Sequence, residues 1–480
     1  AKEVAAPLVF PRHDSAPTTE AQREILHSVM MGDEANCAYN ESNVIRYDGA
    51  LDVPALRAAL LDLVVRHPAL RSTFTADGER QIFHAAPRLI EIRKHDFSAL
   101  TADARELHWS QVKEDEARTP FDLVRGPLYR LHLGRLTADH HELLFTAHHI
   151  VCDGWSFGMI LMELAECYNA RKAGTLPLLP PAMSFADYAR HEASNHANRA
   201  EAEAWWVDQF STGAPVLELP TDRPRPQVKT FAGAMESLEL DADRYARLKK
   251  ASPKLGGTLF ATLLASFATL LHRLTGQEDV VIGVPAAGQT RIDRDELVGH
   301  CLNFLPLRLA PAATRAFRGF AEEVKEQVLE AYDHQDATFG SLLKKLALPR
   351  DTSRLPLVNV MFNIDKSGID RIAFDGLGFD VWTNPKRHVN FDLFFNLVQS
   401  DGRMIVECEY NPDLHDAATI RRWLACYEQL IESAIADGET ALHALPILDA
   451  EESRRTLVDW NATQRDYPRT ATLACLISSV

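Results

Sequence analysis

Apolar positions along this chain follow two different periods, which predict strands and helices in alternation. The clearest case is at residues 141–147, where an apolar run predicts a buried strand. Directly after it, five apolar or aromatic residues recur at helical spacing: Phe157, Ile160, Leu161, Leu164 and Tyr168. The stretch between them is therefore predicted to be a loop that joins a strand end to a helix start. Such loops present side chains while the rigid flanks hold them in place.

The same alternation continues through both halves of the chain. Helices are predicted at 18–31, 53–64, 102–117, 259–271, 316–332 and 417–435. Thr18 or Thr19 could cap the first of them, with Gln22 three residues after Thr19 as a capping-box partner. Strands are predicted at 42–48, 81–84, 89–94, 128–133, 235–240, 279–285, 301–309, 358–364, 371–381, 390–398 and 404–410. Since the two halves mix helices and strands in a similar order, we expect two α/β lobes of similar architecture.

Proline-rich stretches suggest where these lobes begin and end. The segment 174–181 is the best candidate for a lobe boundary, because proline interrupts regular structure there. We expect a linker at 1–16, an N-terminal lobe at 17–178, a C-terminal lobe at 179–450 and a second linker at 451–480.

Composition limits the classes of function. The chain has 480 residues, of which 46% are hydrophobic and 25% charged, and its formal net charge is -16. This acidic balance, without a basic stripe, argues against nucleic-acid binding. No apolar run is long enough to span a membrane, and the first residues lack the pattern of a signal peptide. The seven cysteines are odd in number and none forms a Cys-x-x-Cys pair, so we expect a reducing, cytoplasmic setting.

The loop after the 141–147 strand carries the candidate chemistry, in the pattern His-His-x-x-x-Asp-Gly. Neighbouring residues on a strand point to opposite faces, so His148 and His149 are expected to have different roles. A neutral imidazole can accept a proton from an attacking group and return it to a leaving group. Asp153 could orient a histidine, brace the loop or cap the next helix, while Gly154 permits close approach of a substrate.

Two competing interpretations of the same loop are weaker. Cys152 is a possible thiol nucleophile, but a small apolar filler is the commoner role for a free cysteine. Adjacent histidines are not spaced to share a metal ion, so no metal is expected. No Gly-x-Ser-x-Gly elbow, P-loop or dinucleotide fingerprint stands out. A general base without a protein nucleophile favours direct transfer between two bound substrates, aided by their positioning.

Several blocks together identify a family resemblance. They are, in order, TEAQREIL, RHPALRSTF, AHHIVCDGWS, SFADYARHE, VVIGVPAAG, LVGHCLNFLPLRL, HQDATFGSLLKKL and RLPLVNVMFN. In this combination, over roughly residues 17–450, the chain resembles condensation domains of nonribosomal peptide synthetases, within the chloramphenicol-acetyltransferase-like superfamily. The tail LVDWNATQRDYP is similar to a linker that enters an adenylation domain, which suggests a segment excised from a multidomain synthetase.

The resemblance implies a fold and a reaction. The fold would be two acetyltransferase-like lobes in a V-shaped pseudo-dimer with a central tunnel. Upstream donor and downstream acceptor carrier proteins would each deliver a substrate on a 4'-phosphopantetheine arm, and the domain itself would bind no cofactor. The downstream amine would attack the upstream thioester and form a peptide bond. The excised domain is expected to be monomeric, next to an adenylation domain, with no membrane partner.

The resemblance also implies roles for individual residues. His149 matches the family's key histidine, which acts as a base or orients the amine. Supporting positions that match are His148, Asp153, Gly154, Arg71 and Tyr168, and the motif adds Trp155 and Ser156 as candidate substrate-binding residues. Many members pair the motif aspartate with an arginine, but Gln289 occupies that position here. Either Arg291 replaces the missing arginine, or Gln289 makes a milder hydrogen bond to Asp153.

Two alternatives to carrier-dependent amide formation remain open. The histidine motif also occurs in acyltransferases that use free CoA esters or form esters, although the adenylation-like tail speaks against free-standing action. A non-catalytic recruitment domain is the other alternative, and the intact motif argues against it. More finely, the GDEANCAYNES and LVGHCLNFLPLR blocks resemble condensation domains that take polyketide or fatty-acyl donors. An L-amino acceptor is the default expectation.

Overall fold

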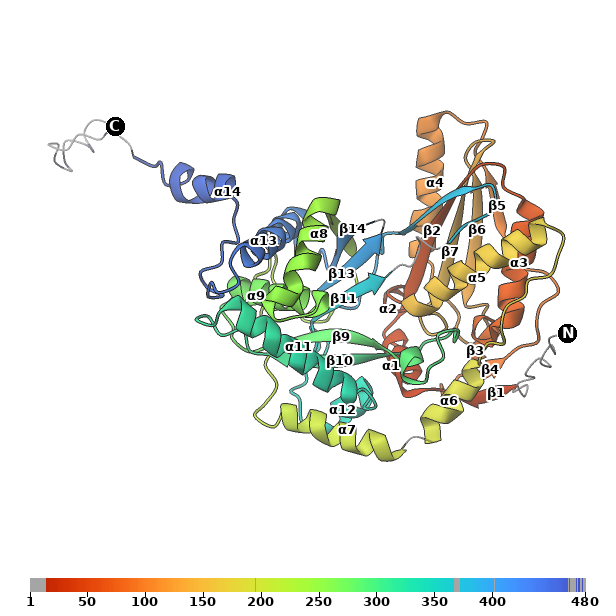
Figure 1. The fold of residues 1–480 in the computed structure, drawn as a ribbon, viewed down its shortest axis with the longest axis horizontal. Helices are drawn as coiled ribbons and strands as arrows, with labels where there is room; N and C mark the ends of the chain where they lie inside the picture. The colour runs from red at the N-terminus through yellow and green to blue at the C-terminus, as the bar shows by residue number, and fades with distance from the viewer. Residues whose placement is uncertain are drawn as a thin grey trace.

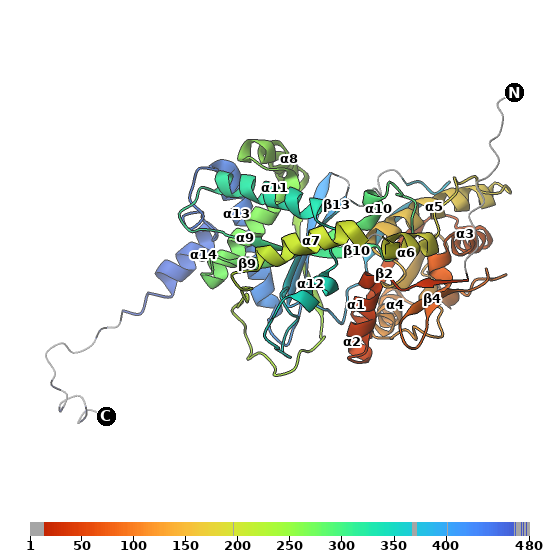
Figure 2. The same ribbon diagram turned by 90° about the horizontal axis from the view of Figure 1, so that it is seen from below.

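The structure is a computed structural model that describes residues 14–194, 196–366, 372–400 and 402–464, with Asp466, Thr472, Ala474 and Ile477. Two large sheets lie side by side, each covered by helices (Figure 1). A small third sheet and several helices lie along the lower side, where α6 and α7 run from the first half toward the second (Figure 2). The mixed α/β class predicted from the alternation is confirmed.

The first large sheet holds the strand that leads to the histidine loop. Its strand order is β12 (Gly378–Thr383), β2 (Asn40–Asp48), β7 (His140–His148), β6 (Tyr129–Arg135) and β5 (Arg93–Asp96). Helices α3 (Val53–Arg66) and α5 (Gly154–Lys172) cover one face, and α4 (Ala102–Ala117) covers the other.

Burial on both faces explains why the central strand β7 has an apolar run rather than alternation. On one face, Leu143 packs into the core formed with α3 and α5. On the other face, Leu144 packs against Trp109 of α4. A strand covered on both sides must be apolar at successive positions. The predicted strand at 141–147 is therefore confirmed, and it is held between two neighbours in hydrogen-bonded register.

The second large sheet forms the core of the other half. Its order is β10 (Leu302–Leu309), β9 (Val280–Ala287), β11 (Val360–Lys366), β13 (Leu393–Ser400), β14 (Arg403–Tyr410) and β8 (Ala234–Leu240). The helices that accompany it are α8 (Ala242–Ala251), η2 (Ser252–Leu255), α9 (Leu259–Thr275), α11 (Phe317–Asp333) and α13 (Ala417–Ala436). Because α9 is buried on every side from Ala261 to His272, it is the central helix of this half.

The remaining elements lie outside the two large sheets and their covering helices. The small sheet has the order β1 (Ser15–Pro17), β4 (Arg80–Phe83) and β3 (Ser72–Phe74). The helices are α1 (Glu20–Val29), α2 (Asp33–Cys37), η1 (Pro68–Arg71), α6 (Phe185–Ser194), α7 (His196–Gln209), α10 (Gly288–Arg291), α12 (Phe339–Lys345), α14 (Ala450–Arg454) and η4 (Arg455–Asp459). The predicted capping box at the start of α1 is confirmed: Thr19 accepts from Gln22, whose side chain accepts from the Thr19 backbone.

Three predicted segments differ from the structure. The strand expected at 89–94 starts only at Arg93, as β5. The strand expected at 371–381 begins only at Gly378, after a turn, and part of the expected range lies outside the described residues. The extended segment expected from Asp459 follows the helical stretch of α14 and η4 and begins with a turn at Trp460 and Asn461. Its Tyr467-Pro468 pair lies outside the described residues.

One strand crosses between the halves. β12 comes late in the chain, yet it pairs antiparallel with β2 as the edge strand of the first sheet. The connection at 175–184 contains no helix or strand, as expected for a linker. Sheet membership alone does not define a domain, so the division at 178/179 and the two terminal linkers stay predictions.

Within the described residues, no single helix has both the length and the apolar character needed to cross a membrane. The bent pair 242–255 and 259–275 passes that test by length and composition only. The six cysteines in the described part of the chain are all free and buried.

Candidate active site at the end of strand β7

The predicted strand–loop–helix arrangement positions the histidine motif. Strand β7 ends at His148, and α5 begins at Gly154. The loop is held at its start, because the His149 N–H donates to the Tyr39 carbonyl at 2.8 Å and the His148 N–H to the Leu128 carbonyl at 2.9 Å. Both flanks of the loop therefore belong to well-packed elements, which limits the movement of the two imidazoles.

His148 points into the protein interior. Its side chain is fully buried, with the rings of Tyr39 and Phe121 beside it. Its Nδ1 accepts the Ile150 N–H at 3.2 Å. Burial, followed by the proximity of His149, lowers the pKa of His148 to about 3, so the ring is neutral near pH 7. His148 thus stabilises the loop from the inside.

His149 faces the opposite way and keeps 19% of its side-chain surface open. Its Nδ1 lies 3.2 Å from Nδ1 of His300, a buried residue directly before β10. The two rings meet edge to face, with centroids 4.9 Å apart. Its Nε2 lies 3.8 Å from Oε1 of Glu41 on β2. The contrast between the two histidines agrees with the alternation expected of neighbouring strand residues.

Glu41 belongs to a charged group that links the two sheets. Lys386 lies between Glu41 of β2 and Glu409 of β14, with Nζ at 2.8 Å and 3.7 Å from their carboxylates. Burial on its own would raise the pKa of Glu41, but Lys386, followed by His149, lowers it overall. Glu41 is therefore a carboxylate near neutral pH, beside the exposed edge of His149.

Asp153 is the best-bonded side chain of the motif. Its carboxylate accepts from the Ser156 N–H at 2.8 Å, the Cys301 N–H at 2.9 Å and the Gln289 amide. It is 1% exposed. The first bond caps α5, and the other two tie that helix to the segment around β9 and β10. This arrangement supports the bracing role considered for Asp153 in the sequence.

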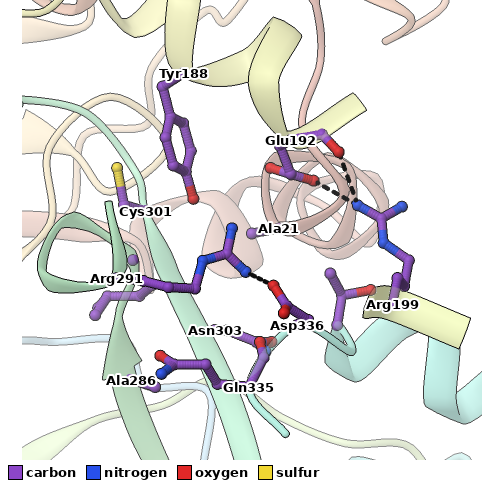
Figure 3. Close-up of a pocket in the computed structure, with 13 residues that line it drawn as sticks. Ala21, Tyr188, Glu192, Arg199, Ala286, Arg291, Cys301, Asn303, Gln335 and Asp336 are labelled. Carbon is purple, nitrogen blue, oxygen red and sulfur yellow. Dashed lines mark hydrogen bonds and ion pairs between the residues drawn. The ribbon is translucent and has the colours of Figure 1, made fainter. Parts of the chain in front are cut away.

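The two residues considered as partners of Asp153 have different positions. Gln289 donates its amide to both oxygens of Asp153, at 3.1 Å and 3.3 Å. Arg291 instead forms an ion pair with Asp336, in a small pocket that is also lined by Tyr188 (Figure 3). Of the two alternatives, the structure therefore supports the hydrogen bond from Gln289.

The first turn of α5 places the other motif residues. Gly154 is exposed, and a Cβ built there would have Asp365 of β11 as its nearest neighbour, with Oδ1 at 4.0 Å. Trp155 is 37% exposed, and its indole donates to the Asp295 carbonyl at 2.9 Å. Ser156 is fully buried, and its hydroxyl accepts the Gly299 N–H at 3.0 Å. The predicted substrate contacts of Trp155 and Ser156 stay predictions.

Two other matched residues lie apart from the loop. Arg71, in η1, donates to the His84 backbone carbonyl just beyond β4. Tyr168 is buried in α5, 14 residues beyond Gly154 and thus about 21 Å along the helix axis. Its hydroxyl accepts the Asp52 N–H at 3.1 Å, and its ring packs against Phe374. The structure thus gives Tyr168 a role in packing α5 against the start of α3.

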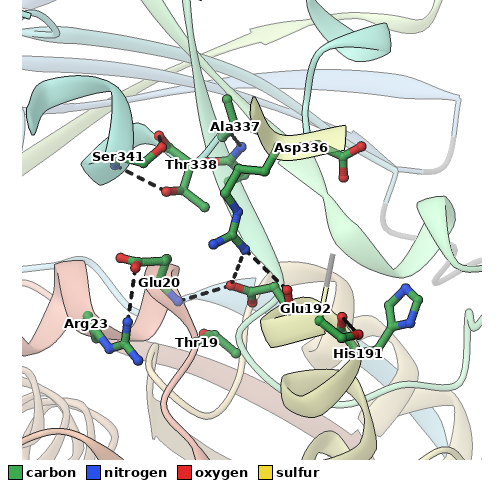
Figure 4. Close-up of polar contacts among 12 residues, drawn as sticks. Thr19, Glu20, Arg23, His191, Glu192, Asp336, Ala337, Thr338 and Ser341 are labelled. Atoms are coloured by element: carbon green, nitrogen blue, oxygen red, sulfur yellow. Dashed lines mark hydrogen bonds and ion pairs between the residues drawn. The ribbon is translucent and has the colours of Figure 1, made fainter. Parts of the chain in front are cut away.

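Three of the sequence blocks meet at α1. Glu24 of the TEAQREIL block accepts the Gly340 N–H of α12 at 2.6 Å. The Glu20 N–H donates to Glu192 of α6 at 3.2 Å, and Arg199 of α7 pairs with the same carboxylate (Figure 4). These contacts join α1 to elements from the middle and late chain.

No nucleophile of the protein lies open in the loop. Cys152 is 1% exposed, and burial, followed by Asp153, raises the pKa of its thiol well above the usual value. The thiolate is the reactive form of cysteine, so this environment suppresses it. This result agrees with Cys152 as a filler. Among the residues that the structure describes, no group of three or more His, Cys, Asp or Glu side chains could hold a metal ion.

Sequence reasoning missed the groups that surround His149. His300, Glu41, Lys386 and Asp365 come from four separate segments, and none is close to the motif in sequence. Two features of the sequence could have drawn attention to these residues. Glu41 is a charged residue directly before the strand predicted at 42–48, and His300 is a histidine inside the LVGHCLN block. Neither signal names a partner, since the contact exists only once the sheets have come together.

Curated relatives come from peptide synthases. A linear gramicidin synthase from Brevibacillus parabrevis is 37% identical over 444 residues, which is 90% of this chain and 8% of the relative. A plipastatin synthase from Bacillus subtilis (strain 168) is 32% identical over 472 residues, 97% of this chain and 18% of the relative. The chain thus spans less than a fifth of the length of these relatives.

Solved structures support the fold. The X-domain from teicoplanin biosynthesis is 27% identical with a TM-score of 0.78, over 92% of this chain and 99% of that one. A holo four-domain nonribosomal peptide synthetase bound to AMP and glycine has a TM-score of 0.81 at 20% identity, over 94% of this chain and 35% of that one. The condensation domain family itself matches residues 12–457. The chain therefore belongs to the condensation domain family, as the motif blocks predicted.

Proposed function

We propose that this domain forms an amide bond between an upstream acyl or peptidyl thioester and a downstream amine, each on the phosphopantetheine arm of a carrier protein. The observation that carries the proposal is the contrast between the two histidines. His148 is fully buried, whereas His149 keeps 19% of its side-chain surface exposed, with its Nε2 3.8 Å from Oε1 of Glu41. An imidazole in this position can accept a hydrogen bond from an attacking amine or take its proton.

The surrounding residues favour direct attack over a covalent acyl-enzyme. Cys152 and Ser156 are both buried, and the Ser156 hydroxyl already bonds within the protein. An α-amine with an ordinary pKa of about 7.7–8.0 is partly uncharged near pH 7. Holding amine and thioester together then supplies much of the rate. The amine nitrogen bonds to the thioester carbonyl carbon, the C–S bond breaks, and the amine proton passes to the departing thiolate.

The partners belong to the same proposal. Relatives that are many times longer support carrier proteins on two sides and an adjacent adenylation domain. The two arms would meet at His149 in a tunnel between the lobes of a V-shaped pseudo-dimer, inside the cytoplasm. The GDEANCAYNES and LVGHCLNFLPLR blocks favour a polyketide or fatty-acyl donor, with an L-aminoacyl acceptor.

Mass spectrometry of the loaded carriers tests this function. Wild-type domain, with a panel of acyl-loaded donors and aminoacyl-loaded acceptors, is expected to move the acyl group onto the acceptor carrier. His149→Ala is expected to lose about 100-fold or more of this rate while keeping its thermal midpoint. His140→Ala is a matched control on the far end of the same strand, where the ring pairs with Asp48. Wild-type turnover by His149→Ala would contradict the role of His149.

A second candidate function is recruitment of another enzyme. It is favoured by one similarity, because the teicoplanin X-domain has also been solved in a complex with OxyB. Under this alternative, no loaded carrier pair gives an amide product with the wild-type domain. Turnover with soluble acyl-CoA and no donor carrier would instead indicate a CoA-dependent acyltransferase.

A further inference from the structure

His149 has both ring nitrogens beside another titratable side chain. On one side, Nδ1 lies 3.2 Å from Nδ1 of His300, within hydrogen-bonding distance. On the other side, Nε2 lies 3.8 Å from Oε1 of Glu41, which is too long for a direct hydrogen bond. One nitrogen is thus engaged by the protein, and the other lies beside Glu41 without a direct hydrogen bond to it.

The burial of His300 limits its role in the first bond. The residue is 3% exposed, and burial, followed by the charges of His149 and His148, lowers its pKa far below the usual value. The ring also bonds to the His149 backbone. A neutral imidazole has one N–H donor and one acceptor nitrogen. His300 therefore either donates to Nδ1 of His149 or accepts from it, and only the second arrangement leaves the Nε2 lone pair of His149 free.

We propose that His300 is a positioning residue that accepts the Nδ1–H of His149 and thereby keeps the lone pair of Nε2 directed at the acceptor amine. This inference rests on the proposed function and names a residue that the motif does not contain. When Nδ1 of His300 accepts, the single N–H of its neutral ring lies on Nε2. His149 must then carry its proton on Nδ1, which leaves Nε2 without one.

The same assignment explains why His149 and Glu41 lie near each other without a direct hydrogen bond. The Nε2 lone pair and the Glu41 carboxylate are both acceptors, and 3.8 Å separates them. One nitrogen about 2.9 Å from each would fit between them and could donate a separate N–H to each. A primary amine has the two N–H groups that this requires. Glu41 stays in place because Lys386 holds the same oxygen at 2.8 Å.

Substitution of His300 separates positioning from folding. His300→Leu removes both hydrogen bonds to His149, whereas His300→Gln keeps an amide oxygen that accepts and an amide group that donates. His415→Gln is a matched control, since His415 is also fully buried but packs against Trp423 in the second half. The experiment uses the same 480-residue domain with loaded carrier proteins.

Two measurements test the proposed role of His300. The first is the ring ¹⁵N spectrum of histidine-labelled protein, in which the His149 signals are identified by their loss in His149→Ala. We expect the Nδ1–H tautomer in wild type and His300→Gln, and a tautomer mixture in His300→Leu. The second is the condensation rate: kcat is expected to fall roughly 100-fold in His300→Leu with little change in KM, and to recover largely in His300→Gln.

The outcomes distinguish this inference from the proposed function. An Nε2–H tautomer in the wild type, or an unchanged tautomer in His300→Leu, would overturn the role of His300 whatever the rates. Equal loss of rate in His300→Gln and His300→Leu would also count against it. If His300→Leu does not fold, the wild-type and His300→Gln spectra still give the answer. Absence of any condensation by the wild type would refute the proposed function, while the tautomer remains measurable.

Discussion

Gln289 donates its side-chain amide to both carboxylate oxygens of Asp153, at 3.1 Å and 3.3 Å, and both residues are buried. A neutral amide thus occupies the position where many family members have an arginine. The carboxylate keeps two backbone N–H donors as well, from Ser156 and Cys301. Hydrogen bonds to a charged acceptor are stronger than neutral ones, so the site can dispense with a full ion pair.

Gln289→Leu tests how much this contact stabilises the protein. The substitution removes two donors from a buried carboxylate, so the free energy of unfolding is expected to fall by about 1.5–3 kcal/mol. Urea unfolding monitored by circular dichroism measures it. Gln111→Leu, at an exposed position of α4, serves as control and is expected to change stability by less than about 0.5 kcal/mol. An unchanged midpoint in Gln289→Leu would show that Asp153 does not depend on the amide.

Tyr168→Phe tests whether this tyrosine supports chemistry or packing. Its hydroxyl accepts the Asp52 N–H at the start of α3, about 21 Å along α5 from Gly154. Losing that bond is expected to cost about 1 kcal/mol of stability. The condensation rate per folded molecule is expected to stay at the wild-type level. A selective loss of rate without loss of stability would assign Tyr168 to the reaction.

Glu407→Gln tests how the stability of the protein depends on pH through a buried carboxyl group of the second sheet. Burial, followed by the nearby charges of Glu409 and Asp365, raises the pKa of Glu407 to about 7, although Asn396 donates to it. Between about pH 4.5 and 7 the folded state therefore binds a proton that the unfolded state has released. The free energy of unfolding of the wild type is therefore expected to fall as the pH rises through this range. Glu407→Gln, which has no carboxyl group to titrate there, is expected to lose less of its stability.

Urea midpoints at about pH 5 and about pH 8, on either side of this range, measure the difference between Glu407→Gln and wild type. Glu239→Gln is the control, because Glu239 is a half-exposed residue of β8 that pairs with Arg403 at the surface. Parallel pH profiles for wild type and Glu407→Gln would contradict the raised pKa of Glu407. The remaining slope in Glu407→Gln would belong to neighbours such as Asp365 and Glu409, whose pKa values burial also raises.

Substitutions of Gly154 test how much space for substrate is needed at the first turn of α5. Among the described residues, a Cβ there has Asp365 within reach, at the ordinary distance of 4.0 Å, so Gly154→Ala is expected to keep folding and activity. Gly154→Leu would extend into the space between α5 and β11 next to His149. We expect its condensation rate to fall roughly tenfold to 100-fold through displaced substrates. The thermal midpoints of the two variants should agree, and equal rates would argue against a reacting group at this position.

Much of the fold follows from local sequence patterns. The apolar run at 141–147, the helical spacing after Gly154 and the Thr19–Gln22 capping box each predicted an element that the structure contains. Hydrophobic period and capping chemistry act within a few residues, so they can be recognised without tertiary contacts. The different directions of His148 and His149 belong to the same class, because backbone geometry alone separates neighbouring strand residues.

Local patterns failed where the partner lies far along the chain. Nothing near β2 indicates that β12 joins it some 330 residues later, and the strand expected at 371–381 began late as a result. The choice between Gln289 and Arg291 as partner of Asp153 was likewise open until β9 and β10 were packed beside α5.

The sequence by itself determined most of the elements, the strand–loop–helix setting of the motif and the opposite directions of its two histidines, of which the family resemblance singled out His149. Only the tertiary structure decided what surrounds that histidine: His300 at Nδ1, and Glu41 with Lys386 on the Nε2 side. The physical reason is distance along the chain. Hydrogen bonds and ion pairs between remote segments depend on how sheets and helices pack, and no periodicity in the sequence records that packing.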